Sequence, residues 1–162
     1  MNEKIKMDGL KEFDRICGQD IDLVFNKMTY GAEGVPEEMW LPAYQFDIVL
    51  HITDAVVGGI NARIGLNESV YYGGHVGYTI KEEYRGNGFA VEAVKLLEQV
   101  FISNGIQKIY ITNSPDNKAS IRVCEKLGAE LVEVAELPEH NNMRTDRGET
   151  HKIIWELDLL RP

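Results

Sequence analysis

Long apolar runs are absent from this chain. No stretch approaches the roughly 20 apolar residues that a membrane-spanning helix needs. The opening segment MNEKIKMDGLKEF also lacks the apolar core of a secretory signal. These two absences predict a cytoplasmic protein without a membrane partner.

Cysteine and positive charge are scarce as well. Cys17 and Cys124 lie far apart, so they predict neither a metal-ligand cluster nor the disulfide framework of a secreted domain. We therefore expect reduced thiols and no bound metal. The 17 basic residues are outnumbered by 26 acidic ones, for a formal net charge of −9. Because no basic patch stands out in the sequence, this charge argues against nucleic acid as a partner.

Three motifs of nucleotide-binding and catalytic proteins are missing. The loop GNGFAVEA lacks the Gly-Lys-Ser/Thr ending of a nucleotide-hydrolase phosphate loop. A dinucleotide fingerprint requires a third glycine three residues after Gly88, where this chain has Val91. The G-x-S-x-G elbow of acyl hydrolases is not found either. Nucleotide hydrolysis is thereby excluded, and the other two activities are disfavoured.

The chain does contain enough apolar material for one core. Its 162 residues are 44% hydrophobic, which predicts a single domain over residues 1–162. Runs rich in β-branched residues predict the strands. QFDIVLHI and AVVGGINARIGL form one antiparallel hairpin, AELVEVAE and THKIIWELDL form a second, and HVGYTI and IQKIYITN are strands between them.

Helical patterns separate the central strands. The helix after residue 88 is the clearest, because an apolar stripe runs from Ala90 to Phe101 while Glu92 faces away. The segment SPDNKASIRVCEKLG predicts a loop and a shorter helix closed by Gly128. Hairpins at both ends and a strand-helix-strand-helix unit between them predict an α/β (α+β) fold, a mixed sheet with helices on its faces.

The first third of the chain predicts a short strand and two further helices. The strand is EKIKM; one helix ends at Gly18, and the next is capped by Asp20. The apolar residues at helical spacing are Leu10, Phe13 and Cys17 in the first helix and Ile21, Val24 and Met28 in the second.

The loop YRGNGFA leads from a strand into the longest helix and predicts an anion site. A helix start leaves backbone N–H groups unpaired, and Gly86 and Gly88 let these groups approach a bulky diphosphate. Arg85 adds a positive charge. Taken alone, the loop is equally consistent with an ordinary strand-to-helix turn.

Two segments resemble the GNAT acyltransferase superfamily. RGNGFA, residues 85–90, fits that family's pattern Q/R-x-x-G-x-G/A between a strand and a long helix. NSPDNKASIRVCEKLG, residues 113–128, is similar to a second segment, above all in the ribosomal-protein N-acetyltransferase branch. GGHVGY resembles a group of uncharacterised predicted acetyltransferases. The resemblance covers residues 47–136 well, the last hairpin loosely and residues 1–40 poorly.

This resemblance implies acetyl-CoA as the co-substrate. In the superfamily, its pantetheine arm lies between two splayed parallel strands of a mostly antiparallel sheet, here residues 76–80 and 108–113. Asn117 matches an asparagine that contacts the cofactor, although a helix cap explains it equally well. The residues implied to bind the cofactor are Tyr78, Thr79, Ile80, Arg85, Gly86, Asn87, Gly88, Phe89, Ala90, Val91, Asn113, Asn117 and Ser120.

The resemblance also implies the catalytic candidates. Many members use as general acid a tyrosine seven residues after the asparagine, where this chain has Cys124. Ser120, which matches a serine of the ribosomal-protein branch, and Cys124 itself are the substitutes, although a free cysteine is commonly a buried apolar residue. His75 is the candidate base, with a structural role equally consistent.

Other routes for the amine proton are water and the loop carboxylates of Glu68 and Glu149. His151 alternates with apolar residues and predicts a core or interface position. The whole pattern implies an acetyl-CoA-dependent N-acetyltransferase acting on a primary amine by direct attack in a ternary complex. The alternative is a non-catalytic acyl-CoA-binding or sensing module, because the tyrosine is missing.

The acceptor is expected to be a small-molecule or peptide amine. The acidic balance of the chain favours a cationic acceptor, although solubility explains that balance equally well. The segment WLPAYQF and the last strand are candidate surfaces for a homodimer.

Overall fold

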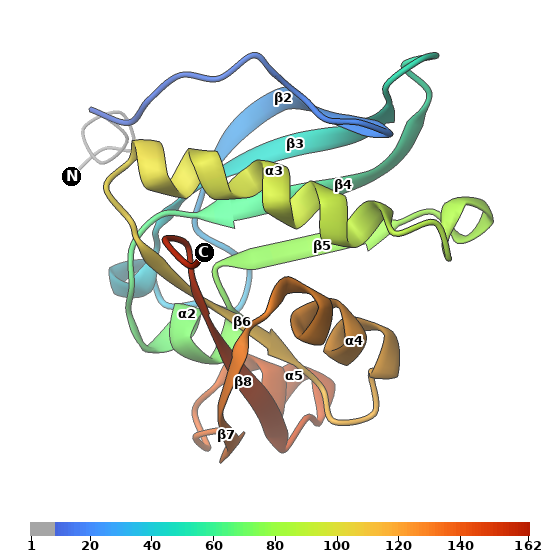
Figure 1. Ribbon diagram of the computed structural model, residues 1–162. Helices are drawn as coiled ribbons and strands as arrows, with labels where there is room; N and C mark the ends of the chain where they lie inside the picture. The colour runs from blue at the N-terminus through green and yellow to red at the C-terminus, as the bar shows by residue number, and fades with distance from the viewer. Residues whose placement is uncertain (1–8) are drawn as a thin grey trace.

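The computed structural model describes residues 9–162, which form two antiparallel sheets and four α-helices (Figure 1). The strands are β1 (Arg15–Cys17), β2 (Ile21–Tyr30), β3 (Pro42–Leu50), β4 (Val56–Arg63), β5 (Val76–Ile80), β6 (Lys108–Asn113), β7 (Glu130–Glu136) and β8 (His151–Asp158). The helices are α2 (Glu68–Gly73), α3 (Phe89–Ser103), α4 (Lys118–Leu127) and α5 (Asn142–Arg147), with 3-10 turns η1 (Glu37–Met39) and η2 (Glu82–Tyr84).

The larger sheet has the strand order β1-β2-β3-β4-β5, and every neighbouring pair is antiparallel. The first predicted hairpin is confirmed as β3 and β4, with Phe46 opposite Ile60. On the other side of β4, Ile60 lies opposite Tyr78 of β5. β5 is the last strand of this sheet, so one of its edges pairs with no strand of the same sheet.

The smaller sheet has the order β6-β8-β7, which confirms the predicted C-terminal hairpin of β7 and β8. β6 pairs with β8 and turns its other edge toward β5. The two edges are joined at one point, where the N–H of His75 donates to the carbonyl of Tyr110 at 2.9 Å and the N–H of Tyr110 donates to Nδ1 of His75 at 2.9 Å. Beyond this joint β5 and β6 diverge (Figure 1). The predicted fold class is confirmed, with two antiparallel sheets in place of one mixed sheet.

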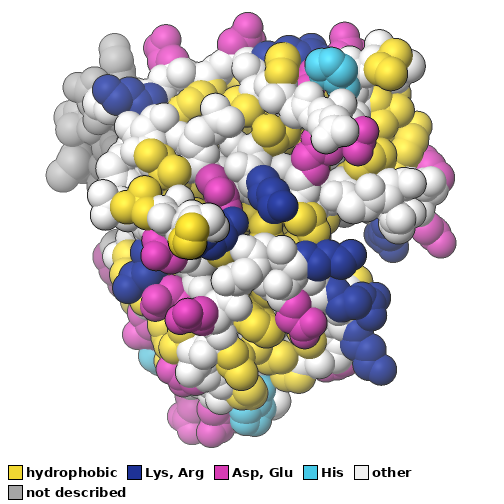
Figure 2. All heavy atoms as spheres, in the orientation of Figure 1, with side chains coloured by type: hydrophobic (Ala, Val, Ile, Leu, Met, Phe, Trp, Pro, Cys, Tyr) yellow, Lys and Arg dark blue, Asp and Glu magenta, His cyan; other side chains and the backbone are white. Residues whose placement is uncertain are grey.

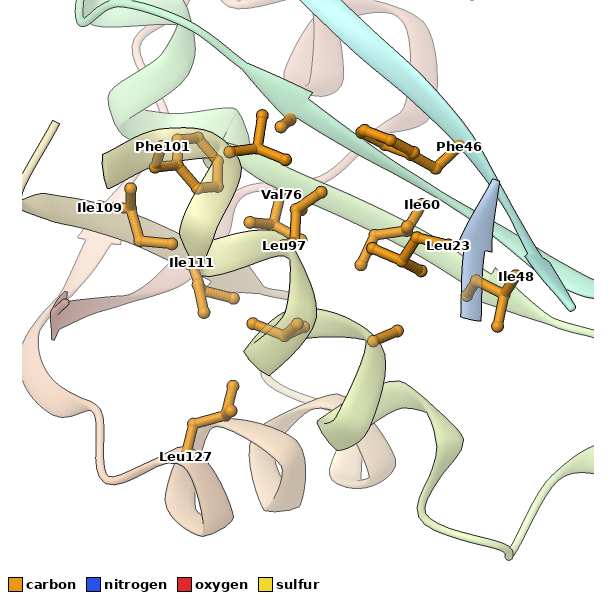
Figure 3. Packing of buried hydrophobic residues seen from close by; sticks show 14 of the residues in the cluster. Leu23, Phe46, Ile48, Ile60, Val76, Leu97, Phe101, Ile109, Ile111 and Leu127 are labelled. Atoms are coloured by element: carbon orange, nitrogen blue, oxygen red, sulfur yellow. The ribbon is translucent and has the colours of Figure 1, made fainter. Parts of the chain in front are cut away.

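α3 packs on one face of the larger sheet and supplies most helical residues of the core. Figure 3 shows Leu97 and Phe101 beside Val76, Ile60 and Leu23 of the strands. The buried residues of the helix are Ala93, Val94, Leu97, Val100 and Phe101. The predicted apolar stripe of this helix is thus confirmed.

Glu92 does not face away from the fold as predicted. Its Oε2 accepts hydrogen bonds from the N–H groups of Gln19 at 2.8 Å and Asp20 at 3.1 Å, in the turn between β1 and β2. A carboxylate that accepts several backbone N–H groups is a strong, charge-assisted contact. α3 is therefore fixed to this turn at its first helical turn.

α4 and α2 lie on opposite faces of the smaller sheet. Asn113 of β6 donates a hydrogen bond to Ser120 of α4, whereas the ring of Tyr110 contacts Tyr71 of α2 with centroids 5.2 Å apart. Strand residues three apart point to opposite faces. Helices are therefore present on both faces, as the fold class requires. α2 and α5 were not predicted, because six residues are too few to show a helical period.

The two helices predicted before residue 30 are wrong. Residues 10–17 contain no helix and end in β1, and residues 21–30 form β2. In β2 a bulge places Phe25 opposite Phe46 but Lys27 opposite Gln45. The extra residue shifts the two-residue alternation by one, so the core side chains are Ile21, Leu23 and Phe25 before the bulge and Met28 after it. Val24 is an apolar residue outside this set, and together with Ile21 and Met28 it imitated a helical stripe.

The strand predicted for EKIKM lies outside the described residues. Within residues 9–162, no helix combines the length and apolar character needed to cross a membrane.

Candidate active site

A cavity of about 900 Å³ lies where β5 and β6 diverge. Residues from both faces of β5 line it: Tyr78 and Ile80 belong to the face that packs on α3, and Gly77 and Thr79 belong to the other. The cavity therefore connects the two sides of the larger sheet through the gap between the strands.

The two parts of this cavity have different walls. We call the part lined by residues 84–91 and α4 the loop end. The part lined by residues 29–45, by Arg63 and by residues 142–152 we call the α5 end. Since the gap beside β5 joins them, a ligand at one end can meet a ligand at the other.

Gly86 and Gly88 shape the loop end. Their φ values of 84° and 75° lie in the left-handed region, which L side chains rarely adopt. Gly88 is the N-cap of α3, so the N–H groups of the first helical turn have no partner within the helix. A Cβ added at either glycine would meet nothing within 4 Å. The helix start therefore faces open space, as an anion site requires.

The polar side chains of this loop hold its conformation. Nε of Arg85 donates to the carbonyl of Ile80 at 2.9 Å, and Nδ2 of Asn87 donates to the carbonyl of Tyr84 at 2.9 Å. Arg85 also lines the cavity, whereas Asn87 does not. The predicted phosphate loop is thus brought to the cavity, with Asn87 supporting it from behind.

The free edge of β5 presents backbone groups to the cavity. The N–H of Lys81 donates to the carbonyl of Val57 in β4, so the odd-numbered positions face β4. Backbone groups alternate along an antiparallel strand, and those of Tyr78 and Ile80 therefore face the gap. Of the three residues predicted to offer backbone, Thr79 is the one whose backbone is turned toward β4.

Asn117 and Ser120 lie at the start of α4. The side-chain oxygen of Asn117 accepts the N–H of Ser120 at 3.1 Å, which is a helix cap. Both residues also line the cavity. The capping role and the position beside a ligand are therefore compatible.

A chain of polar side chains connects β5, α4 and β6. The hydroxyl of Tyr78 donates to Oγ of Ser120 at 3.5 Å. Nδ2 of Asn113 donates to the same Oγ at 3.1 Å and to Sγ of Cys124 at 3.4 Å. Oδ1 of Asn113 accepts Nε1 of Trp155 at 2.8 Å. Of these hydrogen-bonded side chains, only those of Tyr78 and Ser120 line the cavity.

Burial keeps two acidic groups of this hydrogen-bonded series protonated, the thiol of Cys124 and the hydroxyl of Tyr78. It raises the pKa of the Cys124 thiol to about 11, and it also raises the pKa of the Tyr78 hydroxyl. Cys124 is fully buried on the inner face of α4, and it does not line the cavity. The hydroxyl of Tyr78 is the protonated acid that does. Only the backbone of Tyr78 was predicted to bind the cofactor, because no local pattern indicated that its hydroxyl contacts Ser120.

His75 lies at the joint between the sheets and does not line the cavity. It is 2% exposed, its ring stacks on Tyr110, and its Nδ1 accepts the backbone N–H of that residue. Burial lowers its pKa to about 4. The imidazole is therefore neutral at physiological pH and connects the two sheets.

None of the remaining candidates from the sequence, Glu149, Glu68 and His151, lines the cavity. Glu149 accepts a hydrogen bond from Ser114 at 2.6 Å and pairs with Lys152 at 3.1 Å. Glu68 pairs with His140 at 2.6 Å on the surface. His151 is exposed, so it is not a core residue, and its predicted interface position stays a prediction. Among residues 9–162, no three His, Cys, Asp or Glu side chains are grouped so as to hold a metal ion.

The charge of the cavity is opposite to that of the chain. Six basic residues line it, and Glu33 is the one acidic residue among the described part of its wall. The basic residues at the loop end are Arg85, Arg122 and Lys126. Figure 2 shows a group of Lys and Arg side chains over α4. The sequence did not reveal this patch, because its members come together only in the fold.

Three further basic residues, Arg63, Arg147 and Lys152, line the α5 end. Nη1 of Arg63 donates to the carbonyl of Gly74 at 2.7 Å, and Lys152 is largely buried. These residues come from β4, α5 and β8. No motif in the sequence connects them, and they were not predicted.

Comparisons with known proteins agree with this geometry. A family model described as an acetyltransferase (GNAT) domain matches residues 25–130. An acetyltransferase of Photorhabdus laumondii is 33% identical over 81 residues, which are 50% of this chain and 51% of that protein. The chain thus matches about half the length of this curated relative.

Solved structures share the fold at low sequence identity. A candidate ribosomal-protein-serine acetyltransferase of Vibrio cholerae superposes with a TM-score of 0.60 at 17% identity, over 89% of this chain and 97% of that chain. The microcin C7 self-immunity acetyltransferase, solved with acetyl-CoA and AMP, gives a TM-score of 0.51 at 20% identity, over 72% and 61% of the two chains.

Proposed function

The chain belongs to the GNAT acetyltransferase family, and on this premise we propose that it transfers the acetyl group of acetyl-CoA to a primary amine. One observation carries the proposal. Two glycines with positive φ leave the start of α3 open beside the free edge of β5. Residues 1–162 would form a single acetyltransferase domain, with the predicted homodimer and cytoplasmic location as part of the same proposal.

Two features of the loop end suit coenzyme A. The unpaired N–H groups at the start of α3 would bind the pyrophosphate, helped by Arg122 and Lys126. The backbone groups of Tyr78 would pair with the amides of the pantetheine arm, as a neighbouring strand does, while the carbonyl of Ile80 accepts Nε of Arg85. The fold relative solved with acetyl-CoA supports this assignment.

The reaction requires two proton movements. The amine nitrogen attacks the acetyl carbon, a carbon–nitrogen bond forms, and the carbon–sulfur bond breaks. The amine gives up a proton to water, and the leaving thiolate takes one up. We assign the second proton to the hydroxyl of Tyr78, which stands on the strand beside the expected thioester and is protonated at neutral pH.

Two neighbours assist this acid. The hydroxyl of Ser120 lies 3.5 Å from the Tyr78 hydroxyl and positions that group. After Tyr78 has given its proton to the thiolate, Ser120 can transfer a proton from water back to Tyr78. The N–H of Ile80 faces the gap and would stabilise the oxyanion of the tetrahedral intermediate. Asn113 donates to Ser120 and to Cys124, so it holds Ser120 in place while neither Asn113 nor Cys124 lines the cavity.

A module that binds acyl-CoA without turnover is the second candidate. The observation that favours it is the buried Cys124 at the place where many family members have their catalytic tyrosine. Both candidates require the same cofactor site. They differ in whether the thioester is cleaved.

Calorimetric titration with coenzyme A, followed by a thiol-release assay with acetyl-CoA and a panel of primary amines, tests the proposal. Binding together with amine-dependent thiol release is the expected result. Binding without release across the whole panel favours the acyl-CoA-binding module. Absence of binding overturns both candidates.

A further inference from the structure

The basic residues at the two ends of the cavity suit different ligands. At the loop end, Arg122 and Lys126 suit the phosphates of coenzyme A. At the α5 end, Arg63, Arg147 and Lys152 line the part of the cavity that the cofactor would leave free under the proposed function. We propose that the acceptor is a primary amine that also carries a carboxylate or a phosphate, and that the α5 end binds this anionic group. This inference rests on the proposed acetyltransferase function.

Arg63 carries a half-buried positive charge without a matching carboxylate. Its Nη1 donates to the carbonyls of Gly73 at 3.4 Å and Gly74 at 2.7 Å. Within residues 9–162, no carboxylate lies within ion-pair distance of its guanidinium, and its other side-chain N–H groups have no partner. An unpaired charge that is largely removed from water is costly. A bound anion would remove that cost.

Arg147 increases this cost, because it places a second guanidinium near the first. Burial, and then the charge of Arg147, lower the pKa of Arg63. Arg147 is exposed at the end of α5 and makes no ion pair among the described residues. Two guanidiniums that face one cavity form the fork-shaped donor set that binds carboxylate or phosphate.

The acidic groups nearby form no ion pair with these two guanidiniums within residues 9–162. Glu149 pairs with Lys152 at 3.1 Å and accepts a hydrogen bond from Ser114 at 2.6 Å. Burial raises the pKa of Glu149, but these two contacts, and then the charge of Arg147, lower it overall. Asp146 is exposed and accepts a bond from Thr145, and Glu33 is exposed at the rim. Arg63 and Arg147 are therefore the basic residues of this end without an ion-pair partner among the described residues.

The rest of this wall is neutral and amphipathic. Gln45 and Asn61 supply amides, and Trp40 supplies an aromatic face whose Nε1 is held by the carbonyl of Val35 at 2.9 Å. Such a wall suits a short aliphatic chain between the amine and the anion. It offers one carboxylate, Glu33, to a second ammonium group.

The spacing along β4 bears on the length of the acceptor. Thr79, beside the expected acetyl group, pairs with Gly59. Arg63 lies four residues further along the same strand, or about 13 Å. An amine and an anion separated by several bonds therefore fit better than the two groups of an α-amino acid.

Steady-state thiol release with matched amine pairs tests the inference. The carboxylate pair is 6-aminohexanoate and 6-aminohexanamide, and the phosphate pair is O-phosphoethanolamine and ethanolamine. We expect kcat/KM to be at least about tenfold higher for the anionic member of one pair or both, and the responding pair identifies the anion. Equal rates within both pairs, or faster reaction of the neutral members, would overturn the inference and leave the acetyltransferase function standing.

Charge reversal locates the site. Arg147→Glu should abolish the preference for the anionic member and speed the reaction of 1,5-diaminopentane, while Lys95→Glu, the same change on the exposed side of α3, should alter neither. An unchanged preference in Arg147→Glu would refute the assignment to the α5 end. Circular dichroism confirms that both variants fold. Failure of every amine to release thiol would instead count against the acetyltransferase function itself.

Discussion

The two ends of the cavity are built from different parts of the chain. The loop end consists of main-chain N–H groups and glycines from one continuous segment, with basic side chains at its rim. The α5 end consists of side chains from many separate elements, and its basic residues alone, among them Arg63 and Lys152, come from three. A site made of backbone depends on local conformation, whereas a site made of side chains depends on the whole fold. The first suits a constant ligand and the second a variable one.

The glycines give the largest expected effect. Gly86→Val combined with Gly88→Val should lower the affinity for coenzyme A at least about 1,000-fold, or about 4 kcal/mol, because both φ values are unfavourable for valine and both side chains would fill the open space before α3. Isothermal calorimetry measures this. Gly105→Val is the matched control, since Gly105 has a φ of 81° and equally open space. Unchanged affinity in the double variant would contradict the main-chain site.

The joint between the two sheets, where His75 lies, should make the stability of the fold depend on pH. Burial lowers the pKa of His75 from its ordinary value of 6.5 to about 4 in the fold, so the unfolded chain binds the extra proton first. Stability should therefore fall as pH decreases from about 6.5 to about 4, by on the order of 3 kcal/mol from this residue. Urea unfolding of the wild type and of His75→Gln across this range isolates the contribution. Parallel pH profiles for the two proteins would contradict it.

The hydroxyl of Tyr78, the proposed general acid, should affect the rate more than the binding of coenzyme A. Tyr78→Phe should lower kcat about 100-fold, or about 2.7 kcal/mol, with little change in coenzyme A affinity, because only the hydroxyl beside Ser120 is lost. Single-turnover thiol release provides the rate. Tyr71→Phe, which removes a hydroxyl bound to Glu133 outside the cavity, is the control. A kcat equal to that of the wild type would exclude Tyr78 as the acid.

The rim of the loop end should give the smallest effect. Arg122→Ala combined with Lys126→Ala should weaken coenzyme A binding about tenfold, or about 1.4 kcal/mol, because both side chains are exposed and screened. Binding of pantetheine, which has no phosphate, should be unaffected. An equal loss for both ligands would mean that these residues act on the pantetheine arm, and the difference between the two ends would then be smaller than described.

The same difference explains what the sequence predicted. α3, β5 and the loop between them were predicted because the two-residue and 3.6-residue periods and the glycines at 86 and 88 are local signals. β2 was mistaken for a helix because an apolar residue outside the core, Val24, and the shift in alternation after Phe25 together imitated a helical spacing. The family resemblance then supplied the ligand that the loop suits.

Contacts between distant residues carry no such signal. Tyr78 and Ser120 are 42 residues apart, and their meeting depends on how α4 packs beside β5. Arg63 and Arg147 come from a strand and from a helix of six residues that was not predicted. Net charge pointed to a cationic acceptor, whereas the wall of the cavity has the opposite charge. Composition averages over the surface, and a site is a departure from that average.

The carboxylate of Glu92 has a consequence for how this family member tolerates mutation. It holds the turn between β1 and β2 through the main chain of Gln19 and Asp20, so the identities of those two exposed residues are of little importance. Position 18 is different, because a Cβ there would come within 2.6 Å of the Glu92 carboxylate. In a saturation library, positions 18 and 92 should be nearly invariant while 19 and 20 drift freely. Two neighbouring residues would then bear opposite selective constraints.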